Sequence, residues 1–470
     1  MSGLELDHAI DNSAAGWRFD VTGQLVDIGE PTDASAIGDV AGKVVLISPD
    51  VRTVPTADPP GQDQFTALLT ALKAKGAKLV ISYDFIENQT VLPMVQLFNP
   101  NDIQALRGRL AAGVDQLHAI GQPYSPYVYA LHNTLTGALP NGQAWHFDRS
   151  TLATVDATFR KPSPGAHFND QFFGYSDPDT GTSGSFDRQY VQPQDLVEYF
   201  TPGVTWSEFT GDDLDANSSF SEQTIFTTYQ AGQHTTSRWG SAPFGPRLPL
   251  VPYTNLDGKL LPWVYRQGDK LYTAIPMFND ADVSHVDSPD SGAVVDTGST
   301  TLYRDGTVVD TSDVPGVAGF TLPRRSGAYR LVVDGTRATT LSPHVHAEWT
   351  FASGHTDPAV RTASSLLDVG FTLPLDGFES AVAGAPLSGT LMVSTQQGAT
   401  AVPVNQVTVD VSYDDGKTWR PAPVHPAGKG RWSLTVPGGG AAGGFATLRA
   451  SVGGAGGSVT ETITRAYALK

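Results

Sequence analysis

The sequence contains no cysteine among its 470 residues, and this absence removes three kinds of chemistry at once. Disulfides, thiolate nucleophiles and thiolate metal ligands all require that side chain. Long apolar runs are also missing, since no stretch approaches the ~18 apolar residues of a membrane-spanning helix. Residues Met1 to Leu6 have neither the basic start nor the apolar core of a signal peptide. We therefore expect either a cytosolic protein or a piece cut from a longer secreted precursor.

Positive charge is scarce as well. The chain has 30 Lys and Arg against 48 Asp and Glu, which gives a formal net charge of -18 and an isoelectric point near 4.9. A protein that binds nucleic acid needs a basic footprint, and no run in the sequence supplies one. An anionic membrane surface would repel such a chain. The sequence therefore predicts neither nucleic acid nor membrane as a partner.

What the sequence does contain favours several β-rich domains. Hydrophobic residues make up 40% of the chain, which is enough to build cores, and 470 residues suggest about three domains at roughly 150 residues each. Glycine (49) and proline (33) are abundant, and Thr and Val recur in short runs. This composition favours short strands and turns over long helices. We expect a mainly β, multidomain protein that begins with an α/β domain.

The α/β domain is predicted over residues 1–115. Two strands, 17–21 and 24–28, flank a turn at Gly23, and two buried strands follow at 42–48 and 78–82. The spacing of apolar residues predicts a helix over 62–75 with Gly76 as its C-cap. A further strand over 92–97 and a helix over 101–112 complete the unit.

The remainder divides into a connecting segment, 116–185, and two predicted β-sandwiches. In the connecting segment we expect a helix over Tyr127–Leu135 and buried aromatic side chains at Tyr124, Tyr127, Tyr129, Trp145 and Phe147. The first sandwich, 186–360, includes a hairpin with Asp305-Gly306 at its tip. The second, 364–470, alternates over Val407–Tyr413 and is typical of an immunoglobulin or fibronectin type III-like fold. There Trp419 is predicted to lie in the core near Trp432.

The order of these blocks resembles a known family. The run Gly42–Ile47, a helix, Gly76–Ile81, Leu92–Val95 and a final helix resemble a protease-associated domain. The runs Val411–Trp419 and Thr462–Tyr467, with Thr300–Gly306 and Ala347–Phe351, resemble the C-terminal, non-catalytic regions of large secreted subtilisin-like serine proteases from Streptomyces and related actinobacteria. The resemblance implies secretion and attachment to a serine protease catalytic domain. It does not imply that this chain cleaves anything.

Motifs that look catalytic do not assemble into a triad. Asp296-Thr297-Gly298 follows an apolar run, as the Asp of a subtilase does, but no His-Gly pair follows it. As an aspartic-protease motif it lacks a partner, because Asp179-Thr180-Gly181 lies in a polar stretch. Gly181-Thr182-Ser183 continues into Gly184 and Ser185 rather than a helix. We interpret the 296–298 motif as a loop leading into a strand over 300–303, and 181–183 as a surface loop. The chain by itself is therefore predicted not to be an enzyme, with no catalytic residue assigned.

Metal sites are weighed in the same way. His344, His346 and Glu348 alternate, so on a strand they share one face and, with His355 nearby, could hold zinc. The same alternation is typical of a half-exposed strand, which is the favoured interpretation. The acidic loops Asp212–Asn217 and Asn279–Asp282, with Asp287 and Asp290, offer oxygens for calcium but lack EF-hand spacing. No cofactor is predicted, and calcium stays open. Six aromatic residues are interpreted as core rather than a sugar-stacking platform: Trp206, Phe209, Trp239, Phe244, Trp263 and Tyr265.

Two functions follow from these observations. The leading hypothesis is a secreted, non-catalytic accessory region that docks protein or peptide substrates or stabilises the protease catalytic domain of the same precursor. The alternative is a stand-alone extracellular module that binds a polysaccharide or a surface protein. A hydrolase on the β-sandwich is disfavoured, because a nucleophile without a base has little reactivity.

Overall fold

A computed structural model describes most of the chain in two compact units, residues 1–126 with 189–191 and residues 127–188 with 192–470. The units are described separately. The described residues are 9–10, 19–29, 37–47, 62–83, 91–97, 100–121, 126–132, 146–160, 168–177, 182–190, 193–212, 221–224, 226–249, 253–254, 260–287 and 296–470. No helix among them is long and apolar enough to cross a membrane.

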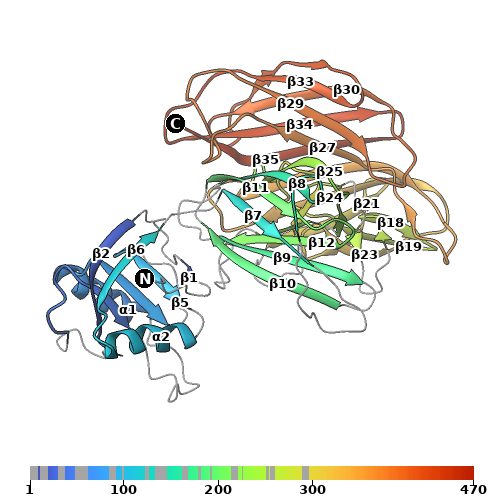
Figure 1. Cartoon of the computed structure of the whole chain (residues 1–470). Helices are drawn as coiled ribbons and strands as arrows, with labels where there is room; N and C mark the ends of the chain where they lie inside the picture. The colour runs from blue at the N-terminus through green and yellow to red at the C-terminus, as the bar shows by residue number, and fades with distance from the viewer. Residues whose placement is uncertain are drawn as a thin grey trace. The chain divides into compact units, whose positions relative to one another are not determined.

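The first unit is a six-stranded sheet with helices, drawn in blue and cyan in Figure 1. The strand order is β1-β5-β4-β3-β2-β6; β2, β3, β4 and β5 run parallel to one another, whereas the edge strands β1 and β6 are antiparallel to their neighbours. The predicted strands around Val44 and Leu79 therefore share one sheet. The elements are β1 (Ala9–Ile10), β2 (Phe19–Asp27), β3 (Val44–Ile47), α1 (Gln62–Ala74), β4 (Leu79–Tyr83), β5 (Met94–Leu97), α2 (Pro100–Ala111) and β6 (Gln116–Gly121).

Alternate residues of the central strands separate two cores. Val45 and Val80 pack with Leu69 and Leu72 of α1. Their strand neighbours Val44, Leu46, Leu79 and Ile81 pack instead with Ile103 and Leu106 of α2. Because successive strand residues point to opposite faces, the two helices cover opposite sides of the sheet. Both predicted helices are confirmed within one residue of their expected starts.

The predicted turn at Gly23 is wrong, because residues 19–27 form the single continuous strand β2. A Cβ at Gly23 would lie 3.0 Å from the carbonyl oxygen of Gly42. The glycine therefore lets the backbone at Gly42 approach the strand closely. Such a close approach, besides a turn, is a reason for glycine within a strand. Gly76 does end α1 as predicted, with a φ of 83°.

The second unit is built from β-sheets, which confirms the expectation of a mainly β protein. Its smaller sheets have the orders β15-β8-β11-β7, β23-β19-β18-β26, β16-β17 and β10-β9-β12-β13-β20, with β14 paired to β12. Their strands are β7 (Tyr127–Ala130), β8 (Ala153–Phe159), β9 (Phe168–Asp177), β10 (Thr182–Tyr190), β11 (Gln194–Phe200), β12 (Thr205–Asp212), β13 (Ser221–Thr224), β14 (Thr227–Thr228), β15 (His234–Trp239), β16 (Tyr253–Thr254), β17 (Leu260–Leu261), β18 (Val264–Gln267), β19 (Lys270–Ala274), β20 (His285–Asp287), β23 (Val317–Thr321) and β26 (Thr362–Ala363).

A nine-stranded sheet and a four-stranded sheet make up the rest of this unit. The nine-stranded sheet has the order β22-β21-β24-β25-β35-β34-β30-β31, with β28 paired to β35, and the four-stranded sheet has the order β27-β29-β33-β32. Their strands are β21 (Thr297–Arg304), β22 (Thr307–Ser312), β24 (Gly327–Thr336), β25 (His344–Ser353), β27 (Leu367–Thr372), β28 (Ser380–Ala381), β29 (Leu387–Thr395), β30 (Val404–Ser412), β31 (Arg420–Ala422), β32 (Val424–Pro426), β33 (Arg431–Val436), β34 (Phe445–Gly454) and β35 (Gly457–Leu469).

The last strand joins the two predicted sandwiches. β35 pairs with β34 on one side and with β25 on the other. The pairing with β25 extends from His344 opposite Thr464 to Phe351 opposite Gly457. The sheet therefore runs without interruption from residues before 360 to residues after 364. The predicted hairpin is confirmed, with Asp305 and Gly306 at φ of 50° and 84° between β21 and β22.

The predicted helix over Tyr127–Leu135 is wrong where the structure describes it. Residues 127–130 form strand β7, which pairs in parallel with β11. Val128 and Ala130 are buried while Tyr127 and Tyr129 are 43% and 57% exposed, so the pattern has the period of two of a strand. The expected burial of these two tyrosines is wrong as well. Tyr129 stacks on Tyr199 of β11 across the outer face of the sheet. Tyr124 and Trp145 lie outside the described residues.

Trp419 is not the core residue that its sequence position suggested. Its ring is half-buried, and the guanidinium of Arg449 lies 4.2 Å from the ring centroid. Arg449 also donates to Asp410 on the neighbouring strand β30. The residues on either side of Arg449 in β34, Leu448 and Ala450, are buried, so Arg449 lies on the outward face of the strand. Trp432 belongs to β33 of the other sheet. A hairpin leaving β30 carries Trp419 onto the outer face.

Candidate functional site

The motif at Asp296 serves a structural ion pair in this fold. Arg337 donates from Nε and Nη2 to the two carboxylate oxygens of Asp296, at 2.7 and 2.9 Å. The same guanidinium donates to Asp287 at 2.6 Å and lies over the ring of Phe278. Strand β21 starts at Thr297, so the strand begins three residues earlier than the interpretation as a loop allowed. Both oxygens of Asp296 therefore pair with a guanidinium, which stays protonated.

The second motif also differs from its interpretation. Thr182 and Ser183 begin strand β10 and do not lie in a surface loop, while Asp179 to Gly181 lie outside the described residues. Ladder hydrogen bonds with β9 explain the difference, because pairing converts a flexible-looking Gly and Ser segment into a strand.

The histidines of β25 form a half-exposed ladder, as favoured from the sequence. Val345, Ala347 and Trp349 are buried, and the alternate residues face outward. His346 contacts the carboxylates of Asp334 at 2.7 Å and of Glu348 at 3.4 Å, and His344 lies 3.7 Å from Asp334. Among the described residues, a different group satisfies the distances for a shared metal ion, namely Glu222, Asp280 and His285.

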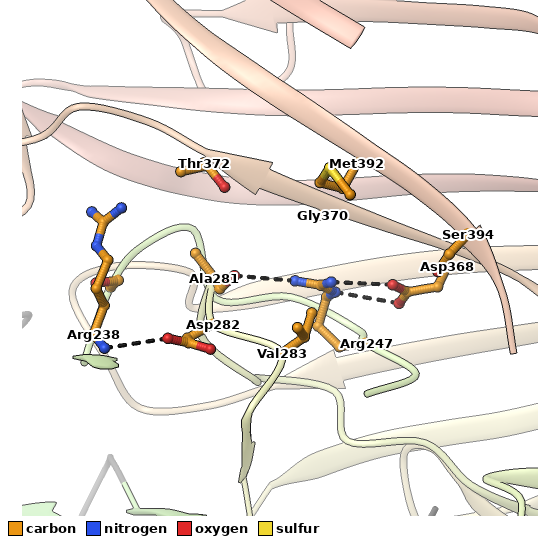
Figure 2. Close-up of a pocket in the computed structure, with 11 residues that line it drawn as sticks. Arg238, Arg247, Ala281, Asp282, Val283, Asp368, Gly370, Thr372, Met392 and Ser394 are labelled. Atoms are coloured by element: carbon orange, nitrogen blue, oxygen red, sulfur yellow. Dashed lines mark hydrogen bonds and ion pairs between the residues drawn. The ribbon is translucent and has the colours of Figure 1, made fainter. Parts of the chain in front are cut away.

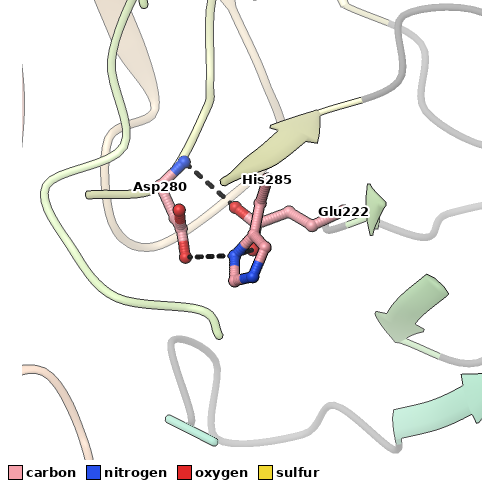
Figure 3. A group of neighbouring side chains, drawn as sticks. All are labelled: Glu222, Asp280 and His285. Atoms are coloured by element: carbon pink, nitrogen blue, oxygen red, sulfur yellow. Dashed lines mark hydrogen bonds and ion pairs between the residues drawn. The ribbon is translucent and has the colours of Figure 1, made fainter. Parts of the chain in front are cut away.

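Two paired strands and one loop bring this second group together (Figure 3). β13 and β20 are antiparallel, with Glu222 opposite Asp287 and Thr224 opposite His285, so Glu222 and His285 share one face of the ribbon. Asp280 precedes β20, and its N–H donates to Oε1 of Glu222 at 3.0 Å. Glu222, Asp280 and His285 are fully buried. We name these three residues the buried triad.

Asn279 fixes the loop that carries Asp280. Its side-chain oxygen accepts from the N–H of Asp287 at 2.9 Å, and its amide nitrogen donates to the carbonyls of Asp280 and Asp282. The loop over Asn279–Asp282, which the sequence offered as a calcium candidate, is therefore held by hydrogen bonds of its own Asn279 side chain. Asp290 and residues 213–217 of the other candidate loop lie outside the described residues.

Burial and like charge shift the titration of the triad. Burial, followed by the charge of Asp280, raises the pKa of Glu222 well above its ordinary range. Burial by itself lowers the pKa of His285, but the neighbouring Asp280 carboxylate outweighs it and the net pKa is raised. Burial likewise raises the pKa of Asp287 to about 6, although Arg337 opposes the shift. The buried triad and Asp287 therefore bring together three carboxyl groups whose negative charge the neighbouring cationic side chains only partly balance.

A cavity of about 280 Å³ is lined in part by Ala281, Asp282 and Val283, which follow Asp280 in the chain (Figure 2). Strands β27 and β29, the end of β15 with the segment after it, and the segment before β20 supply the lining residues. The lining residues are Arg238, Ser241, Arg247, Ala281, Asp282, Val283, Asp368, Gly370, Thr372, Met392 and Ser394.

Arg247 is the central charged residue of this cavity. It donates to both carboxylate oxygens of Asp368, at 3.3 and 3.1 Å, and to the carbonyl of Ala281 at 3.5 Å. Asp368 also accepts from the N–H of Leu248 at 2.7 Å. A Cβ at Gly370 would meet the guanidinium at 2.5 Å, so glycine is required for the arginine to lie flat on β27.

The cavity combines hydroxyl, charged and apolar groups. Its hydroxyl groups belong to Ser241, Thr372 and Ser394. Met392, 37% exposed, supplies an apolar surface, and arginine and carboxylate groups supply polar contacts. Such a mixture can hold a small polar ligand.

Most aromatic residues interpreted as core are confirmed as such. Trp206, Trp239, Phe244 and Trp263 are buried, whereas Phe209 and Tyr265 are only half-buried. The sequence did not single out Glu222, His285 or Arg247. Asp280 lies 58 residues from Glu222 and Asp368 lies 121 residues from Arg247 along the chain, so only the folded structure brings each pair together.

Comparisons with known proteins place the chain in no family. No protein-family model matches it, and no curated protein matches it. A solved structure of the native conformation of Escherichia coli alpha-2-macroglobulin aligns over 64% of this chain and 19% of that one, at 11% identity and a TM-score of 0.16. The three N-terminal domains of the bacteriophage RB49 highly immunogenic outer capsid protein align over 64% of this chain and 91% of that one, at 9% identity and a TM-score of 0.14.

Proposed function

We propose that this chain is the non-catalytic accessory region of a secreted actinobacterial subtilisin-like protease. In this role it docks protein substrates or stabilises the catalytic domain. The observation that carries the proposal is the bidentate pairing of Asp296 with Arg337, because it removes the strongest catalytic candidate of the sequence. With that residue committed to an ion pair, the chain supplies surfaces and stability rather than a reaction.

The folds of the two units support the proposal. Parallel strands β2 to β5, with α1 and α2 on opposite faces, suit a protease-associated domain at the N-terminus. The four-stranded sheet of β27, β29, β33 and β32, with β30, β34 and β35 in the other sheet, suits an immunoglobulin or fibronectin type III-like sandwich at the C-terminus. Domains of these kinds act by presenting binding surfaces.

A second candidate function rests on the cavity around Arg247. A stand-alone extracellular module that binds a polysaccharide or a surface protein would need a preformed concave site with a few convergent polar groups. The cavity of about 280 Å³ has those features. Arg247 is already paired with Asp368, which leaves less charge for a ligand and ranks this function second.

The coding sequence upstream of Gly3 in the source genome distinguishes the two functions. The accessory function predicts an open reading frame that continues into a catalytic domain with Asp-Thr-Gly, His-Gly-Thr and Gly-Thr-Ser-Met-Ala-x-Pro motifs. A signal peptide directly before Leu4 would contradict it and favour the stand-alone module. Labelling of the purified chain with a fluorophosphonate provides an independent check. Modification of any serine, Ser183 or Ser299 above all, would contradict the non-catalytic role.

A further inference from the structure

We propose that the buried triad of Glu222, Asp280 and His285 binds one divalent transition-metal cation of the zinc class as a structural site. This inference is independent of the accessory function. It rests on the distances between the ligand atoms, on the imidazole of His285, whose nitrogens make no hydrogen bond to the described residues, and on the fixed orientation of the two carboxylates.

The separations within the triad suit a shared ion better than direct hydrogen bonds. Nδ1 of His285 lies 3.6 Å from Oδ2 of Asp280 and 3.8 Å from Oε2 of Glu222. Hydrogen bonds from nitrogen to oxygen are shorter, about 2.7–3.2 Å. Zinc bonds of about 2.0–2.2 Å at tetrahedral angles place neighbouring ligand atoms about 3.3–3.6 Å apart. The triad is thus slightly wider than a loaded zinc site and needs only a small contraction.

The imidazole of His285 is buried and directed toward the carboxylates (Figure 3). Neither Nδ1 nor Nε2 has a hydrogen-bond partner within the part of the chain that the structure describes. Buried polar groups without partners are rare in native proteins and require an explanation. Trp239 stacks on the ring, with centroids 3.6 Å apart, so the ring cannot turn away from the carboxylates. A metal ion at Nδ1 explains the orientation of the ring and the lack of a hydrogen-bond partner at Nδ1.

Backbone N–H groups orient each carboxylate by donating to the oxygen that does not face His285. Glu222 accepts from Asp280 through Oε1 at 3.0 Å, and Asp280 accepts from Asp282 through its Oδ1 at 2.8 Å. The opposite oxygens, Oε2 and Oδ2, make only long contacts of 3.4 Å with the N–H groups of Gly240 and Ser241. These are the same oxygens that face His285. Hydrogen bonds that fix ligating carboxylates are characteristic of metal sites.

The local charge also calls for a cation. Two buried carboxylates face one another, and ions taken out of water are stable only when they are paired or coordinated to a metal. The nearby arginines are committed elsewhere, Arg337 to Asp287 and Asp296 and Arg247 to Asp368. A divalent ion balances the formal charge of Glu222 and Asp280.

The donor set identifies the class of ion. One imidazole nitrogen and two carboxylate oxygens are typical of zinc and related transition metals. Calcium prefers six to eight oxygens, so a histidine ligand disfavours it. The three residues leave a fourth coordination position, and because they are fully buried this position is shielded from bulk solvent. The effect of the site is to join β13, β20 and the loop at Asp280.

Metal titration of the tag-free, full-length chain tests the proposal. After treatment with a chelator and dialysis, zinc is added in competition with a chromophoric chelator, and cobalt is added to record its visible absorption. We expect saturation at one ion per chain, tetrahedral cobalt bands and a rise of several degrees in the melting temperature with zinc. Calcium at the same concentration should produce a smaller rise.

Variants locate the site. Glu222→Gln and Asp280→Asn keep the side-chain size and remove one charge each. We expect each to weaken zinc binding by about 100-fold or more, since even the loss of an outer-shell partner costs about 10–100-fold. His346→Asn on β25 is the matched control and should bind zinc like the wild type. Absence of saturable binding to the wild type would overturn the proposal even if a variant fails to fold. Equal affinity in all variants, or loss only in His346→Asn, would overturn it too.

Discussion

The ring of Trp239 lies flat against the ring of His285, with centroids 3.6 Å apart and planes 11° apart. Trp239 is fully buried and stacks on Phe159 with its rings nearly parallel, so it forms part of a continuous aromatic layer. We predict that Trp239→Ala lowers the free energy of unfolding by about 3–5 kcal/mol, because it opens a large cavity and frees the imidazole. Trp239→Phe retains a ring for stacking and should cost less. Urea unfolding followed by circular dichroism measures both, and an alanine variant within ~0.5 kcal/mol of the wild type would contradict the packing.

The buried ion pair between Arg247 and Asp368 gives a second prediction. Arg247→Met removes the cation and leaves Asp368, together with the buried Glu461, without it. Breaking a buried pair from one side typically costs about 3–5 kcal/mol, whereas an apolar replacement of both partners is often neutral. We therefore expect Arg247→Met to be strongly destabilising and Arg247→Met with Asp368→Leu to recover part of the loss. A double-mutant cycle from denaturation midpoints measures the coupling, and additive effects of the two changes would refute it.

Glu379 predicts a dependence of stability on pH. Burial raises the pKa of its carboxyl from 4.5 to about 8, although the N–H of Ala242 and the charge of Arg160 act in the opposite direction. Between pH 4.5 and about 8 the folded state therefore holds a proton that the unfolded state has lost. Stability contributed by this group is present below pH 4.5 and declines as pH rises through about 8.

The variant Glu379→Gln stays uncharged and should remove this decline. Relative to the wild type it should gain stability from pH 6 to about pH 8, by up to about 1.4 kcal/mol per pH unit for one proton, and the difference should level off above about pH 8. Asp414→Asn is the control, because hydrogen bonds from Thr418 and Ser412 lower the pKa of that carboxyl to about 2. Its effect should therefore be constant above pH 6. Melting temperatures of the wild type and both variants, recorded across this pH range, test the prediction. A Glu379→Gln profile parallel to that of the wild type would show that the pKa of Glu379 is not raised in the folded state.

The outer-face position of Trp419 changes the expected cost of its removal. A core tryptophan would cost several kcal/mol, but a cation–π contact with Arg449 at a half-exposed position contributes roughly 0.5–1 kcal/mol. We predict that Trp419→Ala destabilises the chain by about 1 kcal/mol or less and that Arg449→Ala has a similar, non-additive effect. A loss above ~3 kcal/mol in thermal unfolding would return Trp419 to the core.

Local patterns in the sequence predicted the elements that depend on neighbouring residues. The helix over 62–74 follows from apolar spacing and a glycine cap, and the β21–β22 hairpin follows from Asp305-Gly306. The helix predicted over Tyr127–Leu135 was wrong because the tyrosines and valine in this run fit both the helical period of 3.6 and the strand period of 2. Only the pairing with β11 selects the strand. Trp419 failed for a related reason, since hydrophobic size predicts burial but not which side of a hairpin faces the core.

The buried triad could not be predicted from the sequence. Glu222 lies in a segment with no motif, and its strand is only four residues long. The register that places Glu222 beside His285 is set by pairing with β20, and the closure at Asp280 depends on hydrogen bonds of Asn279. Acidic spacing near Asn279 did indicate oxygens for a cation. The proposed ligand set differs from that group, because Asp287 accepts from Arg337 and no sequence pattern pointed to His285.

The proposed accessory role is tested most directly by adding this chain to the catalytic domain that the proposal places in the same precursor. The rate of casein hydrolysis by that domain is measured with and without the chain, before and after heating, beside a calorimetric binding titration. The account predicts saturable binding, no hydrolysis by the chain alone, and either a lower KM for casein or a longer half-life of the heated enzyme. Absence of binding together with unchanged KM and half-life would contradict it, as would casein hydrolysis by the chain itself.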